Sequence, residues 1–354
     1  MRNQTRKTLP TLLSLSSAFP RNAYSQQELY ETLAKDLYRD IPQLERIIRR
    51  VRVKNRYLAL DPREALARDN VLGVGERMAL YERAVMEVGG RSVEGALRTQ
   101  DRERIGSFIM ASSTGYVAPT PDVLLARQFH LSPTMRHTFV GNMACNASLN
   151  VLNVALDSLM ARPDENVLIN CTEFSSLHVR DEASREQLVV HALFGDGSAS
   201  AVLGQAEEGA GPQFLGTHSM QFREAHDLMT WKLLDNGFRM TLSSTVPYLI
   251  RDQIEPFMEA LVTPAGLRVG DIKHWAIHPG GPKIVEVIGE KFGLSDSQLR
   301  STWHVLEEYG NCSSPTVLFV LEEMLAKDKP QQGEYGVMLG FGPGLTMEGA
   351  LVRF

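Results

Sequence analysis

Cysteine is scarce in this sequence, with three residues among 354, namely Cys145, Cys171 and Cys312. Three thiols provide no disulfide framework and are typical of a reducing compartment, so we expect a cytoplasmic protein. Long apolar runs are also missing. None approaches the roughly 20 residues that span a bilayer, so we expect no membrane partner. Acidic residues slightly outnumber basic ones, 42 against 37, which argues against a nucleic-acid partner because such partners usually require a basic surface.

The N-terminus resembles a secretory signal only loosely. Basic residues precede the apolar stretch from Leu9 to Phe19, but Pro10 and three serines interrupt it and no A-x-A cleavage site follows. We interpret this region as a short arm that leads into a first strand. A chain of 354 residues is long enough for one large core or for two fused domains.

The segment from Thr138 to Thr172 predicts a strand, a turn of small residues, a helix and a buried strand. Apolar residues recur at helical spacing from Leu149 to about Met160, and Asn166 to Asn170 is a typical buried strand. Cys145 therefore lies where a strand turns into the start of an apolar helix. Free backbone N–H groups and the helix dipole favour an anion there, which predicts a lowered thiol pKa and a nucleophilic thiolate. The alternative is an inert buried cysteine, the commoner role of this residue.

Strands and helices alternate along the rest of the chain. We expect helices at residues 76–97, 241–261, 283–291 and 316–325, a helix or strand at 189–193, strands at 108–110, 199–203, 275–277 and 335–339, and glycine turns at 194–198 and 340–344.

A weak internal repeat relates the two halves of the chain. Cys145 and Cys312, 167 positions apart, each lie in a small polar turn before a helix, and a buried strand follows each helix. Two related halves of alternating strands and helices predict a layered α/β fold. The polar, glycine-bearing connection at 204–211 divides them, which gives an N-terminal half of residues 1–210 and a C-terminal half of residues 211–354.

Six basic residues lie in the stretch from Arg46 to Arg56, both included. On a helix, Arg46, Arg50 and Lys54 would share one face, which predicts a rim that binds phosphate groups. The alternative is an ordinary solvated helix face, which is the default interpretation of a charged run.

Three polar side chains form a candidate catalytic set. Cys145 starts a helix, His278 follows a strand in a rigid turn, and Asn311 precedes another helix. A thiolate, an imidazole and a carboxamide can provide a nucleophile, its ion-pair partner and an oxyanion hole. Spacing alone leaves His178 and His191 equally available, and for each of those two a structural role is the simpler interpretation.

Linked motifs carry a resemblance to a known family. They are WAIHPGGPK from Trp275, YGNCSS from Tyr309, GFGPGLT from Gly340, LFGDG from Leu193 and STG from Ser113. Over roughly residues 10–354 the chain resembles type III polyketide synthases, the chalcone synthase superfamily, and among them bacterial members such as mycobacterial long-chain alkylpyrone synthases. The resemblance implies a thiolase-like αβαβα layered fold and a homodimer.

The resemblance also implies roles for individual residues. Cys145 matches the acyl-accepting nucleophile, His278 the histidine that keeps it as thiolate, and Asn311 the residue that joins His278 at the thioester carbonyl of malonyl-CoA. Arg46 and Arg50, with Lys54, match the rim that holds CoA phosphates. The pocket positions are Phe194 and Met240 at its mouth, with Ser313, Gly342 and Pro343 in the wall where the chain cyclises.

Several positions depart from the family pattern. Ala144 stands where the family usually has glycine, Asn146 where plant members have an aromatic residue, and Cys312 where many have methionine. Ala118 replaces a methionine that plant members insert into the partner's cavity, and Trp231 falls near a glycine of the plant cavity. These departures leave the implied chemistry intact and change the shape of the cavity.

The implied activity is a decarboxylative Claisen condensation of malonyl-CoA onto an acyl-CoA starter held on Cys145. Cyclisation to an alkylpyrone, resorcinol or phloroglucinol follows, with no metal and no cofactor beyond the CoA thioesters. One alternative is a ketoacyl-ACP synthase of the same fold, although the turn from Pro279 to Pro282 argues against it. The other is a non-catalytic scaffold that binds acyl-CoA.

The starter is the least determined part of the prediction. In the mycobacterial branch, small side chains near the cavity floor open a tunnel for an acyl tail, and the matching positions here are Ser113 and Ser175. We therefore expect an aliphatic starter of medium to long chain. The alternative is that both serines pack against a closed wall, or that Trp231 or Met240 fills the space.

Overall fold

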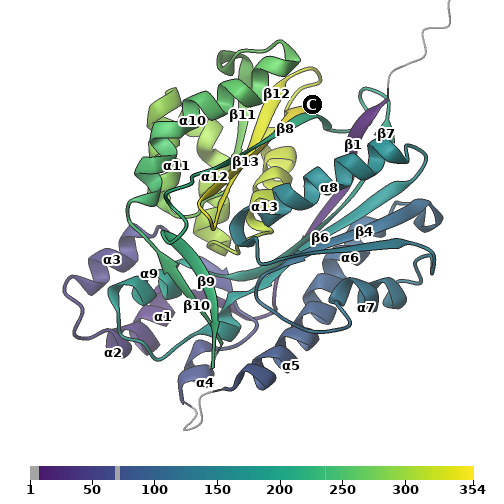
Figure 1. Ribbon diagram of the computed structural model, residues 1–354. Helices are drawn as coiled ribbons and strands as arrows, with labels where there is room; N and C mark the ends of the chain where they lie inside the picture. The colour runs from purple at the N-terminus through teal and green to yellow at the C-terminus, as the bar shows by residue number, and fades with distance from the viewer. Residues whose placement is uncertain (1–7, 68–71, 236) are drawn as a thin grey trace, which may run out of the picture.

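The computed structural model of the chain describes residues 8–67, 72–235 and 237–354. Within these residues, one mixed sheet has the strand order β11-β12-β13-β8-β1-β7-β6-β4-β5 (Figure 1). Its strands are β1 (Leu9–Ala18), β4 (Ile105–Ser112), β5 (Arg136–Gly141), β6 (Asn166–Phe174), β7 (Asp196–Ala206), β8 (Gln213–Gln221), β11 (Ile272–Ile277), β12 (Tyr335–Gly342) and β13 (Thr346–Arg353).

The sheet consists of two parts that meet at β1. In the N-terminal part, β4 is parallel to β5 and β6, while β7 is antiparallel to β6 and β1. In the C-terminal part, β11 is parallel to β12, and β13 is antiparallel to β12 and β8. The pairing of Thr11 with Gln213 joins β1 to β8 and thereby connects the parts.

Helices cover both faces of each part. They are α5 (Val74–Ala84), α6 (Gly90–Leu97), α7 (Pro121–Gln128), α8 (Ala147–Ala161), α9 (Arg185–Leu193), α10 (Val246–Val262), α11 (Pro282–Phe292), α12 (Asp296–Tyr309) and α13 (Thr316–Glu323). A smaller N-terminal group contains α1 (Gln26–Leu29), α2 (Lys35–Leu37), α3 (Leu44–Arg50) and α4 (Pro62–Ala67), with the short strands β2 (Ala23–Ser25) and β3 (Asn55–Tyr57).

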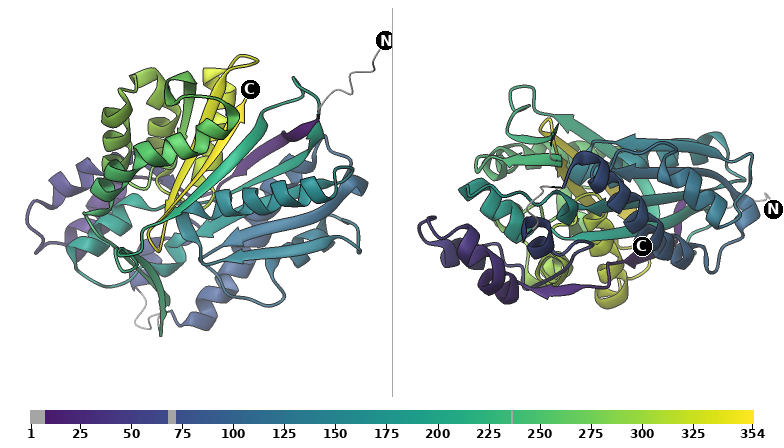
Figure 2. Two further views of the ribbon diagram at one scale, coloured as in Figure 1. Left: turned by 45° about the horizontal axis from the view of Figure 1, so that its top comes forward. Right: turned by 90° about the horizontal axis from the view of Figure 1, so that it is seen from below.

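The burial of alternate strand residues reveals five layers. In β4, Phe108 packs with α5 and α6 in one core, whereas Ile109 packs with α8 and α13 in another. In β11, Ala276 belongs to that second core, whereas Trp275 packs with α10 and α11. Successive strand residues point to opposite faces, so α8 and α13 form a middle layer between the two parts of the sheet. Figures 1 and 2 show the green helices α10 and α11 on one side and the blue helices on the other. The predicted αβαβα fold is confirmed.

Three local predictions were wrong at their boundaries. Residues 196–198 belong to β7 and residues 340–342 to β12, because glycines there allow close packing inside the sheet rather than turns. The predicted helix at 241–261 begins at Val246, since β9 (Met229–Leu234) and β10 (Gly237–Leu242) form a separate hairpin before it. The remaining predicted elements are present, and 189–193 is helical.

In the described ranges, no helix is both long enough and apolar enough to cross a bilayer.

Candidate active site

Cys145 lies in a tight connection between β5 and α8. The chain turns through left-handed residues at Asn142 and Ala144, with φ of 62° and 52°, and a short 3-10 helix at Ala144–Asn146 leads into α8. The backbone N–H of Ala144 donates to Oγ of Ser113 at 2.8 Å. The Cys145 side chain is buried with 2% exposure. Its place at a strand-to-helix connection is the one predicted.

Asn311 approaches Cys145 from the C-terminal half. Its Nδ2 lies 4.0 Å from Sγ of Cys145, and its Oδ1 accepts from the backbone N–H of Ser313 at 2.8 Å. The backbone of Asn311 bonds across to the residues beside Phe194: its N–H donates to O of Leu193 at 2.9 Å, and its O accepts from N of Gly195 at 3.0 Å. These bonds hold the carboxamide against the thiol.

His278 lies at the carboxyl end of β11, where its N–H donates to O of Leu339 in β12 at 2.8 Å. Further along β12, Gly342 packs against Asn146, the residue after Cys145, and a Cβ at Gly342 would lie 2.2 Å from Oδ1 of Asn146. The imidazole is fully buried, and neither ring nitrogen has a hydrogen-bond partner among the described residues. The described part of the chain thus leaves both polar atoms of this buried ring unsatisfied.

Burial controls the protonation of this site. It raises the pKa of Cys145 to about 11, although hydrogen bonds from Ser313 and Asn311 act in the opposite direction. Burial also lowers the pKa of His278 to about 3. The prediction of a lowered thiol pKa at rest was wrong because desolvation of the charged form outweighs the start of the helix. The resting pair is a neutral thiol and a neutral imidazole, so a thiolate requires transfer of the proton.

A small cavity opens beside Cys145, with an empty volume of about 320 Å³. Six of the seven predicted pocket residues line it together with the thiol, and they are Ser113, Ser175, Phe194, Met240, Ser313 and Pro343. Gly342 is not among the lining residues, and it gives room to Asn146 instead. We call this space the reaction cavity.

A second cavity lies behind the reaction cavity, with an empty volume of about 820 Å³ that includes its opening to solvent. Ser175, Phe194, Trp231 and Met240 line both spaces and therefore form a shared wall. Leucines, isoleucine and valines from the N-terminal helices and α9 line much of the rest. Ser113 borders only the reaction cavity, whereas Ser175 borders both.

His178 and His191 line the second cavity, away from the thiol. Nε2 of His178 lies 2.7 Å from the carbonyl oxygen of Thr114, and Nδ1 of His191 lies 2.5 Å from the Tyr38 hydroxyl. Burial lowers the pKa of each imidazole to about 4. Both are neutral side chains in internal hydrogen bonds, which fits the structural role considered for them.

Arg46, Arg50 and Lys54 do not share a helix face, so the predicted geometry of the basic rim was wrong. Helix α3 ends at Arg50, and Arg52 adopts a left-handed backbone with φ of 62°. Lys54 follows this turn and forms an ion pair with Glu307 at 2.6 Å. Lys54 therefore lies beyond the helix that carries Arg46 and Arg50.

Sequence reasoning missed Glu173, which ties together the loops around the thiol. This fully buried carboxylate accepts from the backbone N–H groups of Ser113 and Thr114 and from the hydroxyl of Ser314 at 2.8–3.1 Å. Burial raises its pKa to about 7. A single charged residue in a strand that is otherwise free of charge was the signal that could have identified it.

In the described ranges, no group of three or more His, Cys, Asp or Glu side chains could hold a metal ion.

Comparison with known proteins identifies the family. The N-terminal domain of chalcone and stilbene synthases matches residues 1–207, and their C-terminal domain matches residues 218–354. The alpha-pyrone synthesis polyketide synthase-like Pks18 of Mycobacterium tuberculosis is 32% identical over 97% of this chain and 91% of its own. The 3,5-dihydroxyphenylacetyl-CoA synthase of Amycolatopsis orientalis is 30% identical over 96% of this chain and 92% of its own.

Solved structures agree with the sequence comparison. PKS-I from the brown alga Ectocarpus siliculosus superposes with a TM-score of 0.91 at 28% identity, covering 99% of this chain and 100% of its own. The 1,3,6,8-tetrahydroxynaphthalene synthase of Streptomyces coelicolor gives 0.90 at 26% identity, covering 97% and 99%. The chain therefore belongs to the chalcone and stilbene synthases and is a type III polyketide synthase.

Proposed function

We propose that this synthase transfers an aliphatic acyl group from CoA to Cys145 and extends it with malonyl-CoA to a chain that cyclises as an alkylpyrone. The observation that carries the proposal is that Cys145 lines one buried cavity together with the shared wall, while the Asn311 amide lies 4.0 Å from its sulfur. Members of this family need no cofactor beyond their CoA thioesters.

In the loading step, Cys145 gives its proton to His278 and attacks the acyl carbonyl, and CoA leaves as a thiol. The low pKa of His278 and the high pKa of Cys145 disfavour the ion pair at rest. An acyl thioester consumes the thiolate as it forms, so a small population is sufficient. Once acylated, the sulfur carries no charge and its burial costs little.

In the extension step, the malonyl thioester carbonyl lies between the Asn311 amide and the imidazole of His278. Loss of CO2 moves an electron pair toward that carbonyl oxygen, and both groups donate hydrogen bonds to the enolate. The enolate carbon then attacks the acyl group on Cys145, which breaks the C–S bond and returns the thiolate. Asn311 is oriented for this role by its bond to the Ser313 N–H.

The second cavity supports an aliphatic starter over an aromatic one. Its apolar lining begins at Ser175, Phe194 and Met240, which also border the reaction cavity. Each buried methylene contributes about 0.8 kcal/mol, so a tail of six would gain roughly 5 kcal/mol before the cost of ordering it. Ser175 is small and leaves the passage less obstructed than a larger side chain would.

The CoA portion of the thioester substrate would reach the site by a separate route, over the start of α11. Arg185 and Lys283 border a hollow with an empty volume of about 1430 Å³, which runs over the turn at Gly280 and Gly281 beside His278. Val51 also lines it, next to Arg50. We therefore assign phosphate binding to Arg50, Arg185 and Lys283, and we expect the active form to be a homodimer in the cytoplasm.

The test uses purified protein, malonyl-CoA and acyl-CoA starters from butyryl to dodecanoyl, with products identified by mass spectrometry. We expect alkylpyrones and turnover that rises with chain length. Intact-protein mass spectrometry should show acylation of the wild type and of Cys171→Ala and Cys312→Ala, but not of Cys145→Ala. An acyl adduct on Cys145→Ala, or extension with malonyl-ACP alone, would contradict the proposal.

A further inference from the structure

The β9–β10 hairpin carries the adjustable part of the wall between the two cavities. Trp231 in β9 pairs with Met240 in β10, and both side chains border both cavities. The hairpin is a two-stranded sheet of its own, separate from the nine-stranded sheet. Its position therefore depends on side-chain contacts rather than on a ladder of backbone hydrogen bonds to the core.

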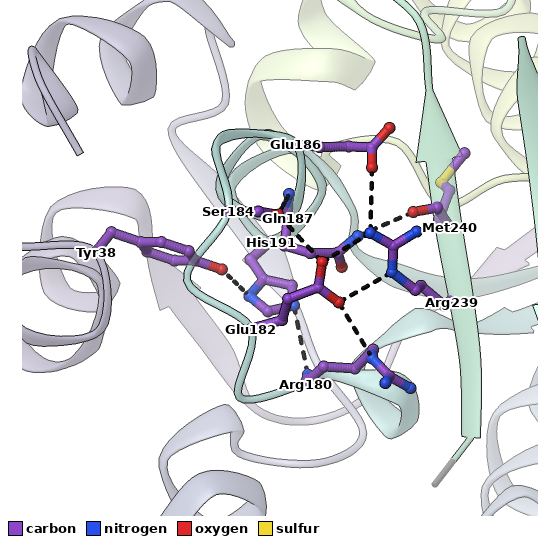
Figure 3. A network of polar contacts seen from close by, with 9 residues as sticks. All are labelled: Tyr38, Arg180, Glu182, Ser184, Glu186, Gln187, His191, Arg239 and Met240. Carbon is purple, nitrogen blue, oxygen red and sulfur yellow. Dashed lines mark hydrogen bonds and ion pairs between the residues drawn. The ribbon is translucent and has the colours of Figure 1, made fainter. Parts of the chain in front are cut away.

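Trp231 Nε1 donates to the carbonyl oxygen of Ser113 at 2.6 Å, and the contacts to β10 around Met240 come from α9 and the segment before it (Figure 3). Nε and Nη2 of Arg239 bind both carboxylate oxygens of Glu182 at 2.9 and 2.7 Å, and Nη2 lies 3.5 Å from Glu186. Glu186 also accepts from the Leu242 N–H at 3.0 Å. The amide of the buried Gln187 donates to the carbonyl oxygen of Met240 at 2.9 Å.

These groups hold β10 on either side of Met240. Neighbouring residues of a strand point to opposite faces, so Arg239 reaches outward to the carboxylates while Met240 faces the cavities. A planar guanidinium bound by two oxygens fixes direction as well as distance. Arg239 touches neither cavity in the described residues, and any effect on the substrate must act through Met240.

We propose that Arg239, bound to Glu182 and Glu186, is a positioning residue that keeps Met240 in the shared wall and thereby limits the length of acyl tail the enzyme accepts. This inference rests on the proposed function, because it takes the second cavity as the site of an aliphatic tail. When the contact is lost, the hairpin moves more freely and Met240 leaves the wall more often. The two cavities then join, and long tails gain more than short ones.

The experiment compares Arg239→Gln, Glu182→Gln and the double variant with the wild type. Arg251→Gln is the matched control, because Arg251 forms an ion pair with Asp252 on the surface of α10. The first readout is the ratio of kcat/KM for dodecanoyl-CoA to that for hexanoyl-CoA. The second is the Kd of unreactive CoA thioethers with six-carbon and twelve-carbon alkyl chains, which requires no catalysis.

Each single variant should raise the long-to-short ratio about two- to fivefold, the size expected from a partly exposed ion pair. The Kd of the twelve-carbon thioether should fall relative to that of the six-carbon thioether by a similar factor. The double variant should match the single variants, because residues that act through one contact are not additive. All three variants should decarboxylate malonyl-CoA at the wild-type rate. The control Arg251→Gln should match the wild type in every measurement.

Three results would overturn the inference: unchanged chain-length ratios in both single variants, a shift toward short tails, or additive effects in the double variant. A different result would contradict the proposed function. If the wild type forms no acyl-enzyme and releases no CO2 from malonyl-CoA, the chemistry is wrong, while the thioether Kd values still report whether Arg239 controls access to the second cavity.

Discussion

Glu173 provides a sharp test of how burial sets the electrostatics of this site. Its Oε2 accepts from N of Ser113, N of Thr114 and the Thr114 hydroxyl at 2.9–3.1 Å. Its Oε1 accepts from the Ser314 hydroxyl at 2.8 Å and shares the Ser113 N–H at the longer distance of 3.1 Å. In Glu173→Gln, an amide oxygen at the Oε2 position keeps the first three bonds. The amide nitrogen then faces the Ser314 hydroxyl, which can turn and accept. The variant should therefore fold.

The pH dependence follows from the pKa of Glu173, which burial raises from 4.5 to about 7. Between these values the folded chain holds a proton that the unfolded chain has released, so the free energy of unfolding falls as pH rises. The contribution is complete below pH 4.5 and is lost as pH passes 7. A pKa difference of this size corresponds to about 3 kcal/mol in the free energy of unfolding. Glutamine has no such titration.

Urea unfolding of the wild type and Glu173→Gln at intervals from pH 5 to pH 8 measures this difference. The variant should gain on the order of 2 kcal/mol relative to the wild type between pH 5 and pH 8, which is most of the full effect, because titrations common to both proteins cancel. Glu173→Ala should be less stable than either at every pH, since two buried N–H groups lose their acceptor at about 1–3 kcal/mol each. A pH-independent difference between wild type and Glu173→Gln would refute the argument.

Further predictions concern the reaction cavity. Asn311→Ala should lose malonyl-CoA decarboxylation yet keep much of its iodoacetamide reactivity, whereas His278→Ala should lose both; equal loss of thiol reactivity would refute this division of roles. Ser175→Phe should shorten the accepted acyl tail and leave decarboxylation intact, so an unchanged chain-length profile would show that the tail takes another path. Ala144→Gly should raise the free energy of unfolding by about 0.5–1 kcal/mol, because it relieves a left-handed φ of 52°; urea titration measures it.

Much of the fold follows from periodicity along the chain. Helix α8 and strand β6 were predicted because a helical apolar pattern and a continuous apolar run differ clearly over their lengths. The β9–β10 hairpin was not predicted, and only its last two residues lie in the helix expected at 241–261. The signal was present in the sequence, because the Asn236-Gly237 pair followed by the alternating apolar residues Phe238, Met240 and Leu242 is typical of a hairpin. The predicted turns at 194–198 and 340–344 were placed at glycines, and part of each belongs to a strand because glycine permits a turn but does not require one.

The sequence pointed to Cys145 and Asn311, which lie close together, and to six residues that line the cavity beside the thiol, but it did not give the electrostatics of the site. A sequence shows that Cys145 precedes a helix, and it does not show that the thiol is 2% exposed or that burial outweighs the helix. Likewise, the position of Lys54 depended on where α3 ends, which the salt bridge to Glu307 and the left-handed Arg52 decide. Such quantities depend on groups distant in sequence and become visible only in three dimensions.

The backbone bonds between Asn311 and the residues flanking Phe194 have a consequence for evolvability. Because these bonds use only main-chain atoms, the side chain at 194 can change without releasing Asn311. Gly195 and Gly310 are different, since a Cβ at either would approach a carbonyl oxygen across the bridge, at 2.4 and 2.7 Å. A library that varies position 194 and leaves both glycines intact should yield enzymes with altered substrate ranges and an unimpaired carboxamide. The same diversity introduced at either glycine should yield mostly inactive ones.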